Sequence, residues 1–91
     1  MITAIVFIHA DVARLSGIAD EISQVPGVSE VYSVTGDLDL VAMVRVRSID
    51  GVATTVTDGI NTVEGVEATQ TQIAFRTVSQ HDLDAAFSIG L

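Results

Sequence analysis

Two short stretches of this sequence carry polar side chains whose types and spacing suit the binding of a small charged molecule. The first is Val34-Thr35-Gly36-Asp37-Leu38-Asp39, in which a glycine and two carboxylates lie within four residues. Glycine lets a ligand approach the backbone, whose N–H groups can hold a carboxylate, while Asp37 or Asp39 can hold an ammonium group. These are the two charged ends of an amino acid. Because glycine and aspartate also favour tight turns, a purely structural turn is the competing interpretation.

The second stretch is Thr69-Gln70-Thr71-Gln72, which is polar within an otherwise apolar segment. Side chains alternate along a strand, so Thr69 and Thr71 are expected on the same face. Threonine hydroxyls donate and accept hydrogen bonds, which makes both residues candidates for the wall of a binding site. A solvent-facing polar side of the strand is the competing interpretation.

The remaining residues offer little for catalysis. Cysteine and lysine are absent, and the two histidines, His9 and His81, are far apart in the sequence. Zinc sites need three or four ligands at suitable spacing, and neither a Gly-x-Ser-x-Gly elbow nor a glycine-rich phosphate loop is present. We therefore expect no catalytic residue, no metal and no cofactor. Binding is favoured over enzyme activity.

The charge balance limits the partners of this protein. Twelve acidic residues stand against four arginines, giving a formal net charge of -8. Direct nucleic-acid binding requires a basic surface that neutralises phosphates, so we expect none, and anionic membranes are disfavoured for the same reason. The apolar start, residues 1–9, is far shorter than the roughly 20 residues that span a bilayer. Together with the lack of cysteine, this predicts a cytoplasmic protein.

The hydrophobic pattern predicts the elements that must position these residues. The periodicity and the turn signals around Pro26-Gly27 and Glu64-Gly65 indicate six elements. Helix caps are expected at Asp11 and at Ser48 or Asp50. The expected elements are a strand over 2–9 buried on both faces, a helix over 11–25, a strand from 28 to the turn at 35–37, a strand over 38–47, a helix over 48–63, and a strand over 66–78. The tail over 79–91 is expected to form a short helix or an ordered tail.

An internal repeat sets the fold class. The pattern Ile22-x-x-Val25-x-Gly27-Val28 recurs as Ile60-x-x-Val63-x-Gly65-Val66, 38 residues later. A doubled βαβ unit predicts an α+β, ferredoxin-like β-α-β-β-α-β fold, with a four-stranded antiparallel sheet and both helices on one face. With 91 residues, the chain suffices for one domain over 1–91.

The face of the sheet without helices is expected to be apolar. If Leu40, Ala42 and Val44 face the helices, Val41 and Met43 lie on the opposite face, to which the first and the last strand can add Phe or Ile. Such a face needs a cover, and a two-fold homodimer packed sheet to sheet, a dimeric α/β barrel, provides it.

These features resemble the ligand-binding (RAM) domain of the Lrp/AsnC, or feast/famine, regulators over nearly the whole chain. The resemblance rests on Ile22-x-x-Val25-Pro-Gly27-Val28, on the run from Val31 to Leu40 with its Thr-Gly-Asp-x-Asp stretch, and on Val63-x-Gly65-Val66 leading to Thr69-x-Thr71. It implies sheet-paired dimers that assemble into tetramers or octamers. It also implies that effectors, usually amino acids, bind between dimers near the turn. By this resemblance Gly36, Asp37 and Asp39 contact the effector, and Thr69 and Thr71 contribute from the last strand.

The chain departs from typical regulators of this family because it begins at the first strand, without a helix-turn-helix. The resemblance therefore implies a stand-alone form that does not bind DNA itself. We expect it to act on transcription or amino-acid metabolism indirectly, through a full-length Lrp/AsnC regulator or by sequestering effector.

Two other classes share this fold. A cofactor-independent monooxygenase of the dimeric α/β-barrel type would need an apolar cavity between sheet and helices, and few aromatics or histidines are present to line it. An ACT-like regulatory domain also binds amino acids at an interface but pairs differently, and the Thr-Gly-Asp-x-Asp stretch favours the Lrp/AsnC type.

Overall fold

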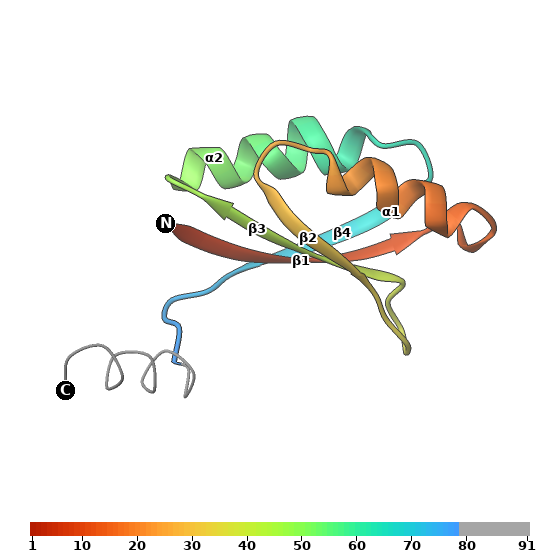
Figure 1. Ribbon diagram of the computed structural model, residues 1–91, viewed down its shortest axis with the longest axis horizontal. Coiled ribbons are helices and arrows are strands. Elements are labelled where there is room, and N and C mark those ends of the chain that lie inside the picture. Colours follow the sequence, from red (N-terminus) through yellow and green to blue (C-terminus); the bar gives the residue numbers. More distant parts are fainter. Residues whose placement is uncertain (79–91) are drawn as a thin grey trace, which may run out of the picture.

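The computed structural model describes residues 1–78, which form a four-stranded antiparallel sheet covered on one face by two helical segments (Figure 1). The strands lie in the order β2-β3-β1-β4. The elements are β1 (Ile2–Ala10), a 3₁₀ turn (Val12–Arg14), α1 (Leu15–Ser23), β2 (Val28–Ser33), β3 (Leu40–Val46), α2 (Ile49–Ala53) and β4 (Val66–Ile73). This arrangement confirms the predicted α+β, ferredoxin-like fold. Within the described part of the chain, no helix is long and apolar enough to cross a membrane.

The core lies between the sheet and the helices. Alternate residues of the two central strands point into it, and the helices supply aliphatic side chains from the other side. The most deeply buried members are Ala4, Val6, Ile8, Ile22, Leu40, Ala42, Val44 and Ile60. The expected orientation of Leu40, Ala42 and Val44 toward the helices is therefore confirmed.

The opposite face, which we call the open face, carries the other half of the alternation. Ile5 and Phe7 of β1 are only half-buried there, so the prediction that this strand is buried on both faces is wrong for the single chain. The reason is that both helices lie on the same side of the sheet (Figure 1). β4 adds Gln70 and Gln72, which pair with Phe7 and Ile5, instead of the expected apolar residues.

The helices begin as predicted but differ in form. Asp11 accepts a hydrogen bond from the backbone N–H of Ala13, and Ser48, not Asp50, caps α2 by accepting from the backbone N–H of Gly51 at 3.0 Å. The expected continuous helix over 48–63 is wrong. It changes from α2 to a π-helical segment, Thr54–Gly59, and then to a 3₁₀ turn, Ile60–Thr62.

The change of helix type leaves the core residues of this segment on one side. Val52, Val56 and Ile60 recur every four residues and all lie in the core. In an α-helix of 3.6 residues per turn such a series stays on one face but rotates by about 40° at each step. The wider π turn offsets part of this rotation.

Two strands are shorter than predicted. β3 covers 40–46, so the connection from β2 is a six-residue loop over 34–39 and not a tight turn at 35–37. β4 ends at Ile73, five residues before the predicted end at 78. The backbone N–H of Ala74 still donates to Thr3 O at 2.9 Å. Because β1 begins at Ile2, no further residues of β1 are present to pair with β4. The predicted short helix within 79–91 lies outside the described residues, and one domain over 1–91 stays a prediction.

The internal repeat corresponds to one backbone turn used twice. Each helical segment is followed by a glycine of positive φ, 97° at Gly27 and 99° at Gly65. The next residue closes the turn, because Val28 N–H donates to Val25 O at 3.0 Å and Val66 N–H donates to Val63 O at 3.2 Å. The repeated sequence therefore encodes the two helix-to-strand connections.

Candidate functional site

The loop over 34–39, hereafter the hairpin loop, projects beyond the sheet and away from the helices (Figure 1). Its ends are joined by a hydrogen bond from the backbone N–H of Val34 to Asp39 O at 3.2 Å. Gly36 has φ of +105°, and no atom lies within 4 Å of the position where a side chain would begin. Asp37 is exposed beside it. The hairpin loop therefore presents open backbone next to a solvent-facing carboxylate.

Asp39 is tied to the neighbouring strand instead of facing solvent freely. Its carboxylate Oδ2 accepts a hydrogen bond from the backbone N–H of Ala10 at 2.9 Å, and its own N–H donates to Ile8 O at 3.0 Å. The Nδ1 atom of His9 lies 4.0 Å from the same carboxylate oxygen. Since the backbone pairing of β1 with β3 ends at Ile8 and Leu40, this side chain extends the connection between the strands by one more hydrogen bond.

Thr69 and Thr71 share one face of β4, as predicted. They pair with Ile8 and Val6, which are both core residues, so the two threonines are on the helix-covered side and half-buried. The Thr69 hydroxyl donates to Asn61 Oδ1 at 2.8 Å. The exposed polar side of this strand is therefore formed by Gln70 and Gln72, and not by the two threonines.

A cavity of about 200 Å³ opens at the free edge of β4. Its lining residues are Asn61, Val66, Glu67, Ala68 and Thr69. Of these, only Thr69 was a candidate from the sequence. Glu67 lies two residues before Thr69, but a register shift interrupts the alternation of side chains there, so the sequence pattern did not place it. Asn61 carried no signal in the sequence, because its place beside β4 depends on how the second helical segment ends.

The structure therefore divides the five predicted site residues into two groups. Gly36, Asp37 and Asp39 belong to the hairpin loop, whereas Thr69 and Thr71 lie on β4. Both groups are near the end of the sheet where β1 finishes, but β1 separates them, because Ile8 pairs with Leu40 on one side and with Thr69 on the other. Two strand spacings amount to roughly 10 Å. Within the described residues, no hydrogen bond joins the two groups.

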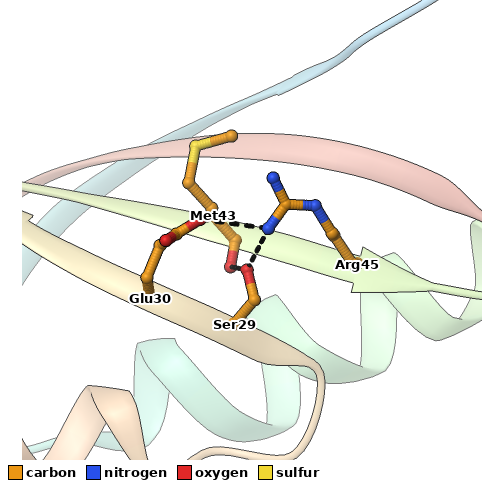
Figure 2. Close-up of polar contacts among 4 residues, drawn as sticks. All are labelled: Ser29, Glu30, Met43 and Arg45. Carbon is orange, nitrogen blue, oxygen red and sulfur yellow. Dashed lines mark hydrogen bonds and ion pairs between the residues drawn. The ribbon is translucent and has the colours of Figure 1, made fainter. Parts of the chain in front are cut away.

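A further polar cluster lies on the open face and was not predicted (Figure 2). Arg45 Nη1 donates to Ser29 Oγ at 2.6 Å and to Glu30 Oε1 at 3.0 Å, and Ser29 Oγ donates to Met43 O at 3.2 Å. The hydrogen bond from Arg45 lowers the pKa of Glu30, and a hydrogen bond to Glu30 raises the pKa of Tyr32. The pairing of β2 with β3 shifts register between Val28 and Glu30, which brings Ser29 beside the arginine.

Residues 1–78 contain no group of three or more His, Cys, Asp or Glu side chains arranged to hold a metal ion. The chemistry that these residues offer is hydrogen bonding and charge recognition, from the hairpin loop on one side and from the β4 cavity on the other.

The fold defines a small α+β domain of the ferredoxin-like class, and comparison with known proteins identifies its family. Residues 3–84 match the family model of the Lrp/AsnC ligand binding domain. The chain belongs to this family.

Curated relatives are transcriptional regulators. The chain is 38% identical over 60 residues to the HTH-type transcriptional regulator LysM of Saccharolobus solfataricus, a match that covers 66% of this chain and 42% of the relative. It is 31% identical over 75 residues to the HTH-type transcriptional regulator FL11 of Pyrococcus furiosus, covering 82% of this chain and 49% of the relative. The chain thus spans about half the length of the curated relatives it matches.

Solved structures agree with this assignment. The crystal structure of TTHA0845 from Thermus thermophilus superposes with a TM-score of 0.82 at 45% identity, covering 88% of this chain and 100% of the other. AsnC of E. coli superposes with a TM-score of 0.80 at 20% identity, covering 87% of this chain and 54% of the other. The second similarity, at this identity, concerns the fold alone.

Proposed function

We propose that this protein is an oligomeric regulatory protein that binds an amino acid or a similar small effector at the hairpin loop. The observation that carries the proposal is the pairing of open backbone at Gly36 with the exposed carboxylate of Asp37. Backbone N–H groups of the loop bind the effector carboxylate, and Asp37 binds its ammonium group. Asp39 contributes chiefly by holding the loop, since its carboxylate already accepts the N–H of Ala10.

The effector site is completed by a second copy of the chain. One small amino acid cannot contact both the hairpin loop and the β4 threonines of one chain, because β1 lies between them. We therefore assign Gly36, Asp37 and Asp39 of one copy and Thr69 and Thr71 of another to the same bound effector. Binding at such a joint changes the stability of the assembly, which is how an effector signal is transmitted.

The open face is the surface through which two copies form a homodimer. Ile5, Phe7, Val41 and Met43 lie side by side at its centre, and all four are half-exposed in the single chain. Packing two such sheets removes this apolar area from water and yields the two-fold dimeric α/β barrel. Dimers then assemble into a tetramer or octamer through the effector joints.

We further propose that the protein acts on transcription or amino-acid metabolism indirectly. Its formal net charge of -8 opposes contact with the phosphates of DNA. The protein therefore acts either through a full-length Lrp/AsnC regulator as its partner or by sequestering the effector. A solved transcriptional regulator from Neisseria meningitidis, which shares this fold at a TM-score of 0.77 and 15% identity, is a complex with L-Met. That complex supports an amino acid as the effector class.

The monooxygenase alternative has less support from the packing. It requires a cavity between sheet and helices, but that space is filled by Val6, Ile8, Ile22, Leu40 and Ile60, each fully buried. The cavity described above lies instead at the sheet edge and is lined by three polar side chains. We therefore favour a binding protein over an enzyme.

The proposal is tested by thermal melting of the pure protein against each of the twenty amino acids, with light scattering in parallel. We expect one or a few amino acids to raise the melting temperature and to change the particle size. Asp37→Asn should abolish that rise, whereas Asp20→Asn, an exposed change on α1, should not. If no amino acid shifts the melting temperature of the wild-type protein, the effector is not an amino acid. Tight sequence-specific DNA binding in a gel shift would contradict the indirect mode of action.

A further inference from the structure

We propose that the β4 cavity is the subsite for the effector side chain, and that it selects amino acids whose side chain ends in a cationic amino group. This inference rests on the proposed function, because it names the effector class for that site. It assigns a specificity role to Asn61 and Glu67, neither of which the sequence singled out.

The lining residues converge because of an irregularity in the sheet. Ala10 pairs with Val66 and His9 pairs with Ala68, so Glu67 is an extra residue on β4 opposite β1. Such a bulge redirects side chains at the end of a strand. Glu67 lines the same cavity as Thr69.

Asn61 is held in the cavity from the other side. It follows Ile60, which is fully buried and anchors the 3₁₀ turn Ile60–Thr62 to the core. The Thr62 hydroxyl donates to Gly59 O at 2.7 Å and tightens the same turn. The hydrogen bond of 2.8 Å from the Thr69 hydroxyl then fixes the Asn61 amide, so that its oxygen faces β4.

The cavity offers hydrogen-bond acceptors and one negative charge. Glu67 contributes a carboxylate, the Thr69 hydroxyl oxygen can accept a hydrogen bond while it donates to Asn61 Oδ1, and no arginine is among the lining residues that the structure describes. The effector carboxylate is therefore repelled here and belongs at the hairpin loop of the other copy, while an ammonium group is attracted. A volume of about 200 Å³ is below the roughly 300–1,000 Å³ of cavities for drug-sized ligands, so it suits a single side chain.

Because β1 separates the two polar groups of one chain, the backbone charges of the effector and its side chain bind different copies in this proposal. A basic side chain extends the amino acid away from its backbone charges, as required if those charges bind one copy and the side chain binds the other. Val66 and Ala68 supply apolar surface against the methylene stem of such a side chain.

The test compares lysine with norleucine, which has the same four-carbon side chain but lacks the terminal nitrogen, by isothermal titration calorimetry on the intact protein. A charge-assisted hydrogen bond to Glu67 predicts that lysine binds at least about tenfold more tightly. Glu67→Gln should reduce the preference for lysine over norleucine severalfold. Adding Asn61→Ala to that variant should reduce the preference further. The matched control is Glu64→Gln. Glu64 is an exposed carboxylate on the preceding turn, its Oε1 atom lies 3.8 Å from Arg14 Nη1, and it does not line the cavity. All variants are first checked for unchanged melting without ligand.

The outcomes separate this inference from the proposed function. If norleucine or another neutral amino acid binds as tightly as lysine, or if Glu67→Gln leaves the preference unchanged, the side-chain assignment is overturned while the effector function stands. If the wild-type protein binds no amino acid at all, this inference and the assignment of an amino acid as the effector both fail.

Discussion

The Asp39 carboxylate accepts a hydrogen bond from the backbone N–H of Ala10 at 2.9 Å, and this contact ties the hairpin loop to the end of the central strand β1. The interaction spans 29 residues of sequence and is partly buried. A residue predicted as a ligand contact is therefore also a structural connector, which affects how its variants should be interpreted.

Asp39→Ala should lower the free energy of unfolding by about 1–2 kcal/mol, because the N–H of Ala10 loses a charged acceptor. Asp37→Ala removes an exposed carboxylate from the same loop and should leave the stability nearly unchanged. Urea denaturation followed by circular dichroism measures both. Equal stability of the two variants would show that the Asp39 hydrogen bond does not stabilise the fold. Loss of effector binding in Asp37→Asn is accordingly a cleaner test of the site than loss in Asp39→Ala.

Tyr32 should ionise above its ordinary pKa of 10.0, because a hydrogen bond to Glu30 favours the neutral phenol. A raised pKa in the folded state means that this contribution to stability is present below the ordinary pKa and is lost as the pH rises through the folded value. Tyr32 is the only tyrosine and tryptophan is absent, so the absorbance of the phenolate reports this group alone. Glu30→Gln should move the midpoint back toward the ordinary value. An identical midpoint in both proteins would argue against the hydrogen bond.

Gly65→Ala should lower the free energy of unfolding by about 1–3 kcal/mol. The position has φ of +99°, and an added methyl group would collide with the Ile18 side chain, which is buried. Gly17→Ala is the matched control, since Gly17 lies within α1 with open space around it and should gain roughly 0.5–1 kcal/mol from the better helix propensity of alanine. Both are measured by urea denaturation, and a loss of stability at Gly17 equal to that at Gly65 would contradict the steric argument.

Phe7→Glu should convert the proposed dimer into a monomer, because it places a charge at the centre of the open face. Val12→Glu offers a matched substitution at a site that is 72% exposed in the 3₁₀ turn before α1, outside the sheet, and it should leave the assembly intact. Size-exclusion chromatography with light scattering distinguishes the two species. A dimer that persists in Phe7→Glu would place the homodimer interface elsewhere.

The fold class could be predicted from the sequence because its main signals are local. Alternating residues such as Leu40 and Val41, and the paired glycines Gly27 and Gly65, specify strand faces and turns through neighbouring positions alone. The same is true of the helix cap at Ser48, whose side chain bonds only three residues away. These predictions needed no knowledge of which strands are neighbours.

Element ends and the site depended on contacts between distant segments. β4 ends at Ile73 because β1 begins at Ile2, and the local pattern predicted neither this end nor the change to a π-helical segment at Thr54. Asn61 joins Thr69 across eight residues, and Asp39 binds Ala10 across the sheet. The sequence by itself determined the order of elements, the faces of the strands and the acidic charge, since these follow from residue type and spacing. Only the tertiary structure decided which polar groups share a cavity and which are held apart by β1, because strand order and register are fixed by the packing of the whole chain.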